Sequence, residues 1–412
     1  MKNKNKGASI VAGILKWTGL ALIMGAVCGI VGAAFSHAIS FVTGLRTAHH
    51  WILYLLPVGG ILSVFIYKLF DVTHLGTDDA VESAHSEKKV SPALFPAVFI
   101  CSVITHLFGG SAGREGAALK MGGGIAAFFS RAFKLSERGR RTLALCAMSA
   151  VFSAVFGAPF GAAFFTVEVV RSAYIRPYAL ILNVISSLSA FGMALLLFVK
   201  PERYHVSDMP SFEWSTLLRV AALGAVCGII SLAFCHAMHY SPKLSKKYIK
   251  NPYVRIVSMS LLLIALTFIS GTRDYNGGGV AFIESIFEGH QVVPWAFALK
   301  LLFTAVTVAA GFKGGEIVPG FFVGATAGAV IAPLLGLPAA AGAALGMAAL
   351  FAGITNCPIS TFILSMEMFG AHGIPYFIVT IVVSFLLSGR LSLYDKDKYP
   401  IKRLISEYRE MK

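Results

Sequence analysis

Long runs without a charged residue dominate this chain of 412 residues and predict membrane-spanning helices. The 50 positions between Glu316 and Glu367 contain no Asp, Glu, Lys or Arg, and Met368–Gly389 adds 22 more. A helix needs about 20 apolar residues to cross a bilayer. Further apolar blocks, mostly interrupted by glycine or proline, predict helices at 51–70, 92–108, 142–168, 177–199, 256–272, 295–310, 317–336, 340–366 and 374–389. Such interruptions are typical of broken or re-entrant helices, whose irregular backbone must be buried in protein or line a cavity.

The composition indicates the same class of protein. Hydrophobic residues make up 56% of the chain and charged residues only 13%, whereas soluble domains carry about 25% charged residues. This excludes a disordered chain and argues against a water-soluble α/β enzyme. We therefore expect an all-α polytopic protein of the lipid bilayer. None of the six cysteines forms a CxxC pair, and no metal site or cofactor is expected.

The formal net charge of +15 comes from basic residues placed between the apolar blocks. Four lysines open the chain within its first sixteen residues, Arg131–Arg141 holds five basic residues, and Lys243–Arg255 holds five with no acid. Basic loops stay on the cytoplasmic side of a membrane, so we expect a multi-pass protein of the cell membrane with both termini in the cytoplasm. Few aromatic residues interleave with these clusters, which argues against nucleic acid as a partner.

An internal repeat divides the chain into two halves. The segment GAVCGIVGAAFSHAI at 25–39 returns as GAVCGIISLAFCHAM at 224–238, an offset of 199. The same offset relates 148–168 to 347–367, and an offset of 201 aligns Glu115 with Glu316. Matches in the same order indicate duplicated units. We expect a cytoplasmic segment, a first membrane repeat, a second membrane repeat and a cytoplasmic tail, at 1–20, 21–200, 201–395 and 396–412.

Charge placement predicts that the two repeats cross the membrane in opposite directions. Lysines precede the first copy at 25–39, but Lys243, Lys246, Lys247 and Lys250 follow the second copy at 224–238. If both sets of lysines face the cytoplasm, the copies are inverted. Inverted repeats are a common transporter design, with the substrate site at the midplane where the halves meet.

The glycine-rich segment Gly109–Gly124 carries the clearest chemistry. It places Arg114 and Glu115 between apolar stretches, and an ionisable residue inside a membrane marks a functional pathway by default. Glycines expose backbone N–H groups where a helix would begin at Gly116, and a helix N-terminus is an anion site. We expect the Glu115 carboxylate to occupy this site itself and to leave it on protonation. The alternative is a glutamate that only caps a buried helix.

A matching loop in the second half, GFKGGEIVPG at 311–320, repeats this design. Gly314 and Gly315 open the backbone, and the amides of Glu316, Ile317 and Val318 can point at the same spot. In the first loop, the backbone of Gly113, Arg114 and Gly116 has the corresponding role. Two helix N-termini aimed at one point from opposite halves predict a midplane anion site.

These loops resemble those of the CLC chloride channel and transporter family. The sequence GREGAALKMG at 113–122 looks like its GREGP-type loop, and GGEIVP at 314–319 resembles its GxFxP loop. The resemblance implies a CLC-like inverted-topology repeat, a homodimer with one pathway per subunit, and anion-coordinating amides at Glu316 and Ile317. It puts Thr77 at the serine anion ligand of the family. It also puts Tyr394, in LSLYD at 391–395, at the anion-binding tyrosine.

Departures from the family pattern indicate a branch. This chain has Val169 where the family has a proton-relaying glutamate, and Lys120 where the family has a glutamine in the helix after the GREG motif. Glu316 replaces an apolar residue of the family's third loop. The glutamate after GG, the small residue Ala117 instead of proline after GREG, and the lack of an internal glutamate together resemble the fluoride/proton antiporter branch. Glu316 beside an anion site would repel the anion unless it is protonated, in which case it donates a hydrogen bond that fluoride accepts more strongly than chloride. The alternative is that Glu316 pairs with Lys313 or Lys120 and holds the loop.

We therefore expect anion transport gated by Glu115, with proton-coupled fluoride export as the first choice and no enzymatic activity. A chloride/proton antiporter or a passive chloride channel is the alternative within the family. An intramembrane serine hydrolase is a distant alternative, because Gly109–Gly113 matches GxSxG at Ser111 and His106 is nearby. Glu168 and Glu367 are equivalent in the repeat. Glu168 could form an ion pair with Arg171 or relay protons.

Overall fold

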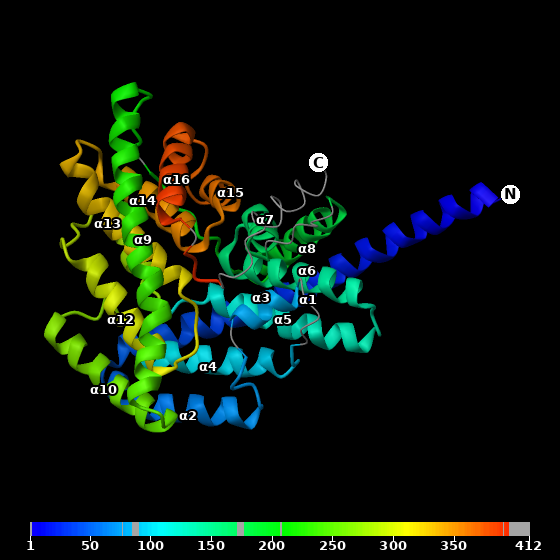
Figure 1. The fold of residues 1–412 in the computed structure, drawn as a ribbon, viewed down its shortest axis with the longest axis horizontal. Helices are drawn as coiled ribbons and strands as arrows, with labels where there is room; N and C mark the ends of the chain where they lie inside the picture. Colours follow the sequence, from blue (N-terminus) through cyan, green and yellow to red (C-terminus); the bar gives the residue numbers. More distant parts are fainter. Residues whose placement is uncertain are drawn as a thin grey trace, which may run out of the picture.

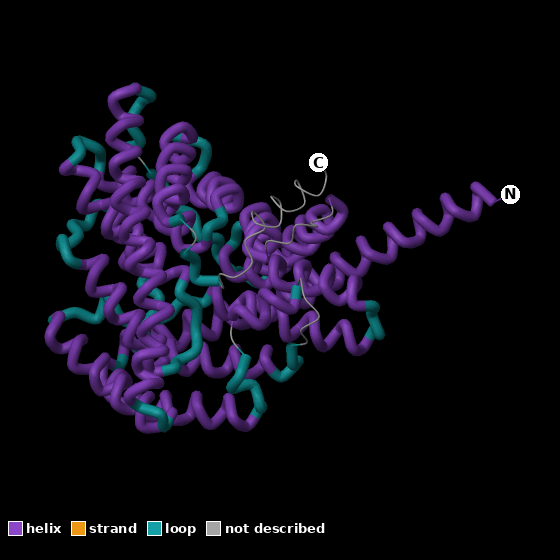
Figure 2. Tube along the Cα trace, viewed as in Figure 1, coloured by secondary structure: helices purple, strands orange, loops and turns teal. Residues whose placement is uncertain are grey.

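The computed structural model describes residues 2–75, 77–84, 90–170, 177–206, 208–389 and 391–394, and these are almost entirely helical (Figures 1 and 2). The first half contains α1 (Lys2–Ala48), η1 (His50–Leu55), α2 (Leu56–Leu69), α3 (Thr77–Ser83), α4 (Leu94–Phe108), α5 (Glu115–Ala132), α6 (Glu137–Phe156), α7 (Pro159–Val170) and α8 (Pro177–Leu196). The second half contains α9 (Trp214–Tyr248), α10 (Pro252–Ser270), α11 (Val280–Phe287), α12 (Ala296–Ala310), α13 (Ile317–Leu334), α14 (Ala339–Thr355), α15 (Pro358–Phe369) and α16 (Ile374–Ser388).

Six of the described helical stretches are long and apolar enough to cross a membrane. They are Val11–Ala48, His50–Leu69, Tyr178–Leu196, Trp214–Tyr248, Pro252–Ser270 and Ile317–Leu334. The N-terminal part of α1 extends beyond the rest of the molecule (Figure 1). Other apolar helices are shorter, from 12 residues in α7 and α15 to 17 in α14. The mixture of long and short helices matches the predicted class of broken and re-entrant helices.

Two of the predicted apolar blocks each contain a break that the sequence pattern did not resolve. The block at 142–168 divides into α6 and α7 at Gly157, whose φ is 80°. The block at 340–366 divides into α14 and α15 at Asn356, whose φ is 55°. In both places the left-handed residue ends one helix, and a proline two residues later begins the next. The hydrophobic pattern continues across the break because both pieces are buried.

The helices of the two halves follow the same order and pack in the same way. Helix α1 packs on α6 and α8, and α9 packs on α14 and α16. Helix α5 lies against α6 as α13 lies against α14. Two equivalent pairs meet across the halves, α2 with α10 and α7 with α15. The fold is the expected all-α inverted-topology repeat.

Helices α7 and α15 are antiparallel, and each supplies an acidic cap to the other. Glu168, near the C-terminus of α7, accepts hydrogen bonds from the N–H groups of Ile359 (3.2 Å) and Ser360 (2.7 Å) at the start of α15. Glu367 of α15 accepts from the N–H groups of Phe160 and Gly161, at 3.0 and 2.6 Å. Carboxylates satisfy free helix N–H groups and complement the helix dipole. Glu168 therefore has a structural role. Arg171, its expected partner, lies outside the described residues.

Candidate anion site

Two glycines at equivalent positions of the repeat end a helix and begin the glycine-rich loop that follows it. Gly109 ends α4 with a φ of 88°, and Gly311 ends α12 with a φ of 97°. Residues with a side chain rarely adopt this left-handed backbone conformation, whereas glycine adopts it readily. Each loop then runs back into the protein and leads to the N-terminus of α5 or α13. The predicted pair of loops is therefore present.

The loops join the two halves through an isolated antiparallel bridge. Gly113 N donates to Gly315 O, and Gly315 N donates to Gly113 O, both at 2.7 Å. The backbones are so close that a Cβ on Gly315 would lie 2.4 Å from Gly116 N, and one on Gly116 would lie 2.7 Å from Gly315 Cα. Only glycine permits this approach.

The bridge corrects the expected alignment of the loops by one residue. Gly113 opposes Gly315, so the offset here is 202, and Glu316 is equivalent to Arg114 instead of Glu115. Arg114 is the N-cap residue of α5, and Glu316 is the N-cap residue of α13. The prediction aligned like residues with each other, but backbone geometry fixes the register.

The N-termini of α5 and α13 present backbone amides beside this bridge. The helical bonding of α5 includes Ala118 N donating to Arg114 O at 3.0 Å, and Gly320 N of α13 donates to Glu316 O at 3.0 Å. The backbone N–H groups of the residues before Ala118 and Gly320 have no backbone acceptor within their own helix. They belong to Glu115, Gly116 and Ala117 in α5 and to Ile317 and Val318 in α13, since Pro319 has no N–H group. Such a pair of helix N-termini favours an anion.

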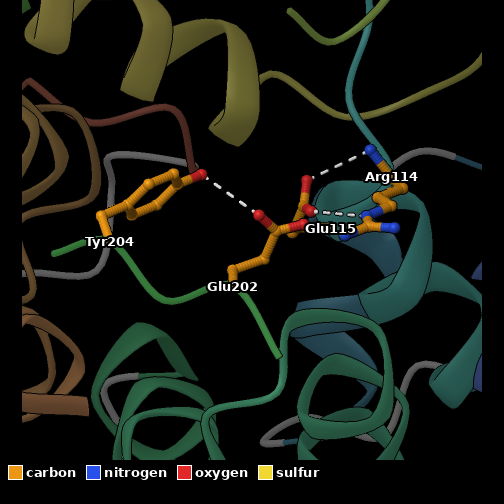
Figure 3. A network of polar contacts seen from close by, with 4 residues as sticks. All are labelled: Arg114, Glu115, Glu202 and Tyr204. Carbon is orange, nitrogen blue, oxygen red and sulfur yellow. Dashed lines mark hydrogen bonds and ion pairs between the residues drawn. The ribbon is translucent and has the colours of Figure 1, made fainter. Parts of the chain in front are cut away.

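Glu115 is the first residue of α5 and is completely buried. Its carboxylate turns back to Arg114, with Oε2 accepting from the Arg114 backbone N–H at 3.1 Å and Oε1 accepting from Nε at 3.3 Å (Figure 3). The carboxylate also accepts a hydrogen bond from the Glu115 backbone N–H, the first free amide of α5. The Glu115 carboxylate therefore lies at the N-terminus of α5, while the amides of Gly116 and Ala117 have no acceptor within the helix.

A polar network extends from Arg114 and includes two residues that sequence reasoning missed. Arg114 Nη2 pairs with Glu202 Oε1, and the Tyr204 hydroxyl donates to Glu202 Oε2 at 3.1 Å (Figure 3). The sequence feature that could have drawn attention to Glu202 and Tyr204 is the polar stretch KPERYH at 200–205, which directly follows an apolar block. It lies about 90 residues from Glu115, so only the fold reveals the contact.

Two cavities approach the loops, and we name them after one residue each. The Tyr394 cavity has a volume of about 460 Å³, and Glu316, Gly315 and Tyr394 are among its lining residues. The Glu202 cavity has a volume of about 640 Å³ and is lined by Gly113 and Glu202, among others. Glu115 lines neither cavity. The bridge, with Gly315 at one cavity and Gly113 at the other, therefore lies between them, and the buried Glu115 lies next to Gly113.

The equivalent helices α1 and α9 reach different cavities at their C-terminal ends. His37, Arg46 and Thr47 of α1 line the Glu202 cavity, whereas Met238, His239 and Lys246 of α9 line the Tyr394 cavity. This is the geometry of an inverted repeat, in which corresponding helices point to opposite faces.

Basic side chains dominate the charge of the Tyr394 cavity. Lys120, Lys246, Arg255 and Lys313 line it together with a single acidic residue, Glu316. Lys120 Nζ donates to Gly314 O at 3.2 Å, and Lys313 Nζ lies 4.2 Å from the centroid of the Tyr67 ring. The half-buried Glu316 makes no side-chain capping bond to α13 in this part of the structure. The cavity can attract anions and presents one carboxyl group to them.

Tyr394 reaches this cavity from a short anchored segment after α16. Leu393 N donates to Ile354 O at 2.7 Å, and Asn356 Nδ2 donates to Leu391 O at 3.1 Å. The Tyr394 ring is buried and packs edge-to-face on Phe165, with centroids 6.2 Å apart. The second half thus places Tyr394 in the wall of the cavity that Gly315 and Glu316 also line. Thr77 begins α3, but its side chain lies outside the described part of the structure.

The serine that suggested a hydrolase is not placed for catalysis. Ser111 is fully buried, and its Oγ lies 3.0 Å from Thr304 Oγ1. His106 directs Nδ1 to Ser102 O at 2.8 Å. Among the described residues, no group of three or more His, Cys, Asp or Glu could hold a metal ion.

Comparisons with known proteins agree with this geometry. The family profile of the voltage-gated chloride channel matches residues 59–389. A chloride/fluoride channel protein of Pseudomonas syringae pv. tomato is 33% identical over 93% of this chain and 87% of its own. An H(+)/Cl(−) exchange transporter of Vibrio cholerae is 24% identical, with 85% of this chain and 81% of its own covered.

Solved structures are also similar. The crystal structure of a CLC-type fluoride/proton antiporter superposes with a TM-score of 0.88 at 28% identity, covering 92% of this chain and 97% of the other. A slow cyanobacterial Cl−/H+ antiporter gives a TM-score of 0.77 at 17% identity, covering 96% and 98%. The second likeness concerns the fold alone.

Proposed function

Because this chain belongs to the voltage-gated chloride channel (CLC) family, a family of channels and transporters, we propose that it exports fluoride from the cell in exchange for protons. The observation that carries the proposal is the pair of helix N-termini at the Gly113–Gly315 bridge, with buried Glu115 between two cavities. An anion held there needs little side-chain chemistry. Glu115 then acts as the gate, since a protonated carboxyl no longer competes with the anion.

In this mechanism, Glu115 and the anion alternate at the helix ends. The ionised carboxylate is held by Arg114, and protonation weakens that pairing because it removes the negative charge. The amides of Gly116, Ile317 and Val318 then hold the anion. Tyr394 donates a hydroxyl bond from its cavity, and Thr77 has the same role on α3.

Glu316 is the residue that favours fluoride over chloride. It lines the Tyr394 cavity beside the bridge, where an ionised carboxylate would repel the anion. A protonated Glu316 instead donates a hydrogen bond, and fluoride is the stronger acceptor. It can also carry protons in place of the glutamate that the family has at Val169. The chloride/fluoride channel of P. syringae and the fluoride/proton antiporter structure support this choice.

We place the Tyr394 cavity on the cytoplasmic side and the Glu202 cavity on the external side. Lys246, from the basic cluster at the C-terminal end of α9, lines the Tyr394 cavity, and basic segments favour the cytoplasm. Both termini are then cytoplasmic, and the protein resides in the cell membrane. We further propose a homodimer with one pathway per subunit, which crosslinking in membranes would test.

Purified protein in liposomes tests the proposal. A fluoride gradient across the membrane should drive protons uphill, as reported by a pH electrode, and a chloride gradient should do so less effectively. Protein-free liposomes control for leakage of hydrogen fluoride. Equal coupling to both ions would favour a chloride/proton antiporter, and anion flux without proton movement would favour a passive channel.

A further inference from the structure

Glu202 is held rigidly at the boundary between the halves. It lies in the connection between α8 and α9, and its N–H group donates to Phe156 O at 3.2 Å. Two residues later, Tyr204 N donates to Met368 O at 2.9 Å. The Tyr204 ring also stacks on Phe287, with centroids 4.9 Å apart. These contacts fix the backbone on both sides of Glu202, so its carboxylate is held next to Arg114 and does not move freely in solvent.

Arg114 is shared between two carboxylates. Its Nε bonds to Glu115 at 3.3 Å and its Nη2 pairs with Glu202 (Figure 3). The exposed fractions of the side chains are 14% for Arg114, 11% for Glu202 and 1% for Glu115. Only the last of these is sealed from water, and Glu202 lines the cavity that leads outward from the site.

This sharing weakens the hold of Arg114 on the gate. A guanidinium that faces one carboxylate can pair with it through two parallel N–H···O bonds. Glu202 takes Nη2, which leaves Glu115 with a single bond from the guanidinium, through Nε, besides the bond from the Arg114 backbone N–H. The three side chains also carry one more negative than positive charge, so the group can take up one proton to become neutral.

We propose, on the basis of the proposed function, that Glu202 is a positioning residue for the gate. Because Glu202 occupies Nη2 of the Arg114 guanidinium, Arg114 cannot pair with Glu115 through two parallel bonds. Glu202 thereby sets the external pH at which Glu115 leaves the site. The Tyr204 hydroxyl keeps Glu202 oriented for this task.

Other charged groups lie around Glu202 and define its surroundings. Glu284 on α11 and Lys200 on the same connection are its neighbours besides Arg114, Glu115 and Tyr204. Arg46, His106 and Arg273 line other parts of the cavity, together with the acidic Asp274. Asp274 accepts from the Thr272 hydroxyl, whereas the ion pairs of Arg114 among the described residues are with Glu115 and Glu202. It therefore offers a matched removal of one negative charge.

The test is the dependence of fluoride/proton exchange on external pH in liposomes. Glu202→Gln should move the midpoint of this profile to lower pH by about one unit and slow exchange at pH 7 about tenfold, because Glu115 is then held more firmly. Tyr204→Phe should give a smaller shift in the same direction. The control Asp274→Asn should leave the midpoint in place.

A second arm separates positioning from a structural role. In a Glu115→Gln background, adding Glu202→Gln should change anion flux no further, since the gate is already neutral. An equal loss of flux in both backgrounds, or an unchanged midpoint in both Glu202→Gln and Tyr204→Phe, would overturn the proposal. If Glu202→Gln fails to fold, the Tyr204→Phe profile decides alone. A Glu115→Gln protein that stays fully coupled would instead contradict the proposed function.

Discussion

Tyr394 and Glu316 line the same cavity, and we propose that these two residues determine which anion is held there. Tyr394 comes from the end of the chain's second half and Glu316 from the N-cap of α13. One is a neutral donor, and the other is a donor only when it is protonated. Their contributions to affinity and selectivity can therefore be separated by substitution.

Tyr394→Phe should weaken anion binding about tenfold without unfolding the protein. A hydrogen bond to an ion contributes about 1.5–3 kcal/mol, and the ring packing on Phe165 is kept in the variant. Calorimetric titration with fluoride and chloride measures the effect, with the melting temperature as the control for folding. An unchanged binding isotherm would remove Tyr394 from the site.

Glu316→Gln and Glu316→Ala should abolish fluoride transport before chloride transport. Both variants remove the proton that the carboxyl group can share with the bound ion. Side-by-side efflux of the two ions from liposomes provides the measurement. A residue that only holds the loop, for example through Lys313 or Lys120, would instead reduce both fluxes in proportion.

Sequence reasoning was most informative where an isolated residue breaks an apolar pattern. Glu115 and its loop were identified because charge is rare in such a chain, and the structure buries Glu115 as expected. Arg114 was expected to contribute only its backbone, yet its side chain links Glu115 to Glu202. Glu202 could not be assigned from sequence because its partner lies in a distant segment and surface glutamates look the same.

At the scale of elements, the site depends on how closely two helix starts approach one another. The loops meet backbone to backbone at Gly113 and Gly315. Both loops were predicted from the sequence, but the predicted alignment was wrong by one residue. Residue identity alone does not show which backbone positions pair in a bridge. The sequence pattern also did not resolve the breaks at Gly157 and Asn356, where apolar residues continue on both sides.

Gly315→Ala should disable transport by separating the two helix N-termini. Its Cβ would lie 2.4 Å from Gly116 N, a backbone atom that can move only with α5. We expect lower thermal stability and loss of anion binding. Gly192→Ala is the control, since nothing lies within 4 Å of the added Cβ and alanine stabilises a helix by about 0.5–1 kcal/mol over glycine. Normal anion binding by Gly315→Ala would show that the close approach is dispensable.

At the scale of the whole molecule, duplication and inversion bring one loop of each half together, with a cavity on either side of the bridge. The repeat and its opposite orientation were predictable because signature segments and lysine flanks survive in both halves. The packing of α1 and α9 on equivalent partners agrees with that prediction. The reciprocal caps of Glu168 and Glu367 were not predictable, since they depend on how α7 and α15 pair across the halves.

The proposed role of Glu115 in linking anion movement to proton movement is tested by comparing two proteins in liposomes. Wild-type protein and Glu115→Gln are reconstituted in parallel, a fluoride gradient is imposed, and uphill proton movement is recorded with a pH electrode. The wild type should move protons, whereas the variant should pass the anion or bind it with no proton movement, because glutamine mimics the protonated side chain permanently. Full fluoride-driven proton movement by Glu115→Gln would contradict the account.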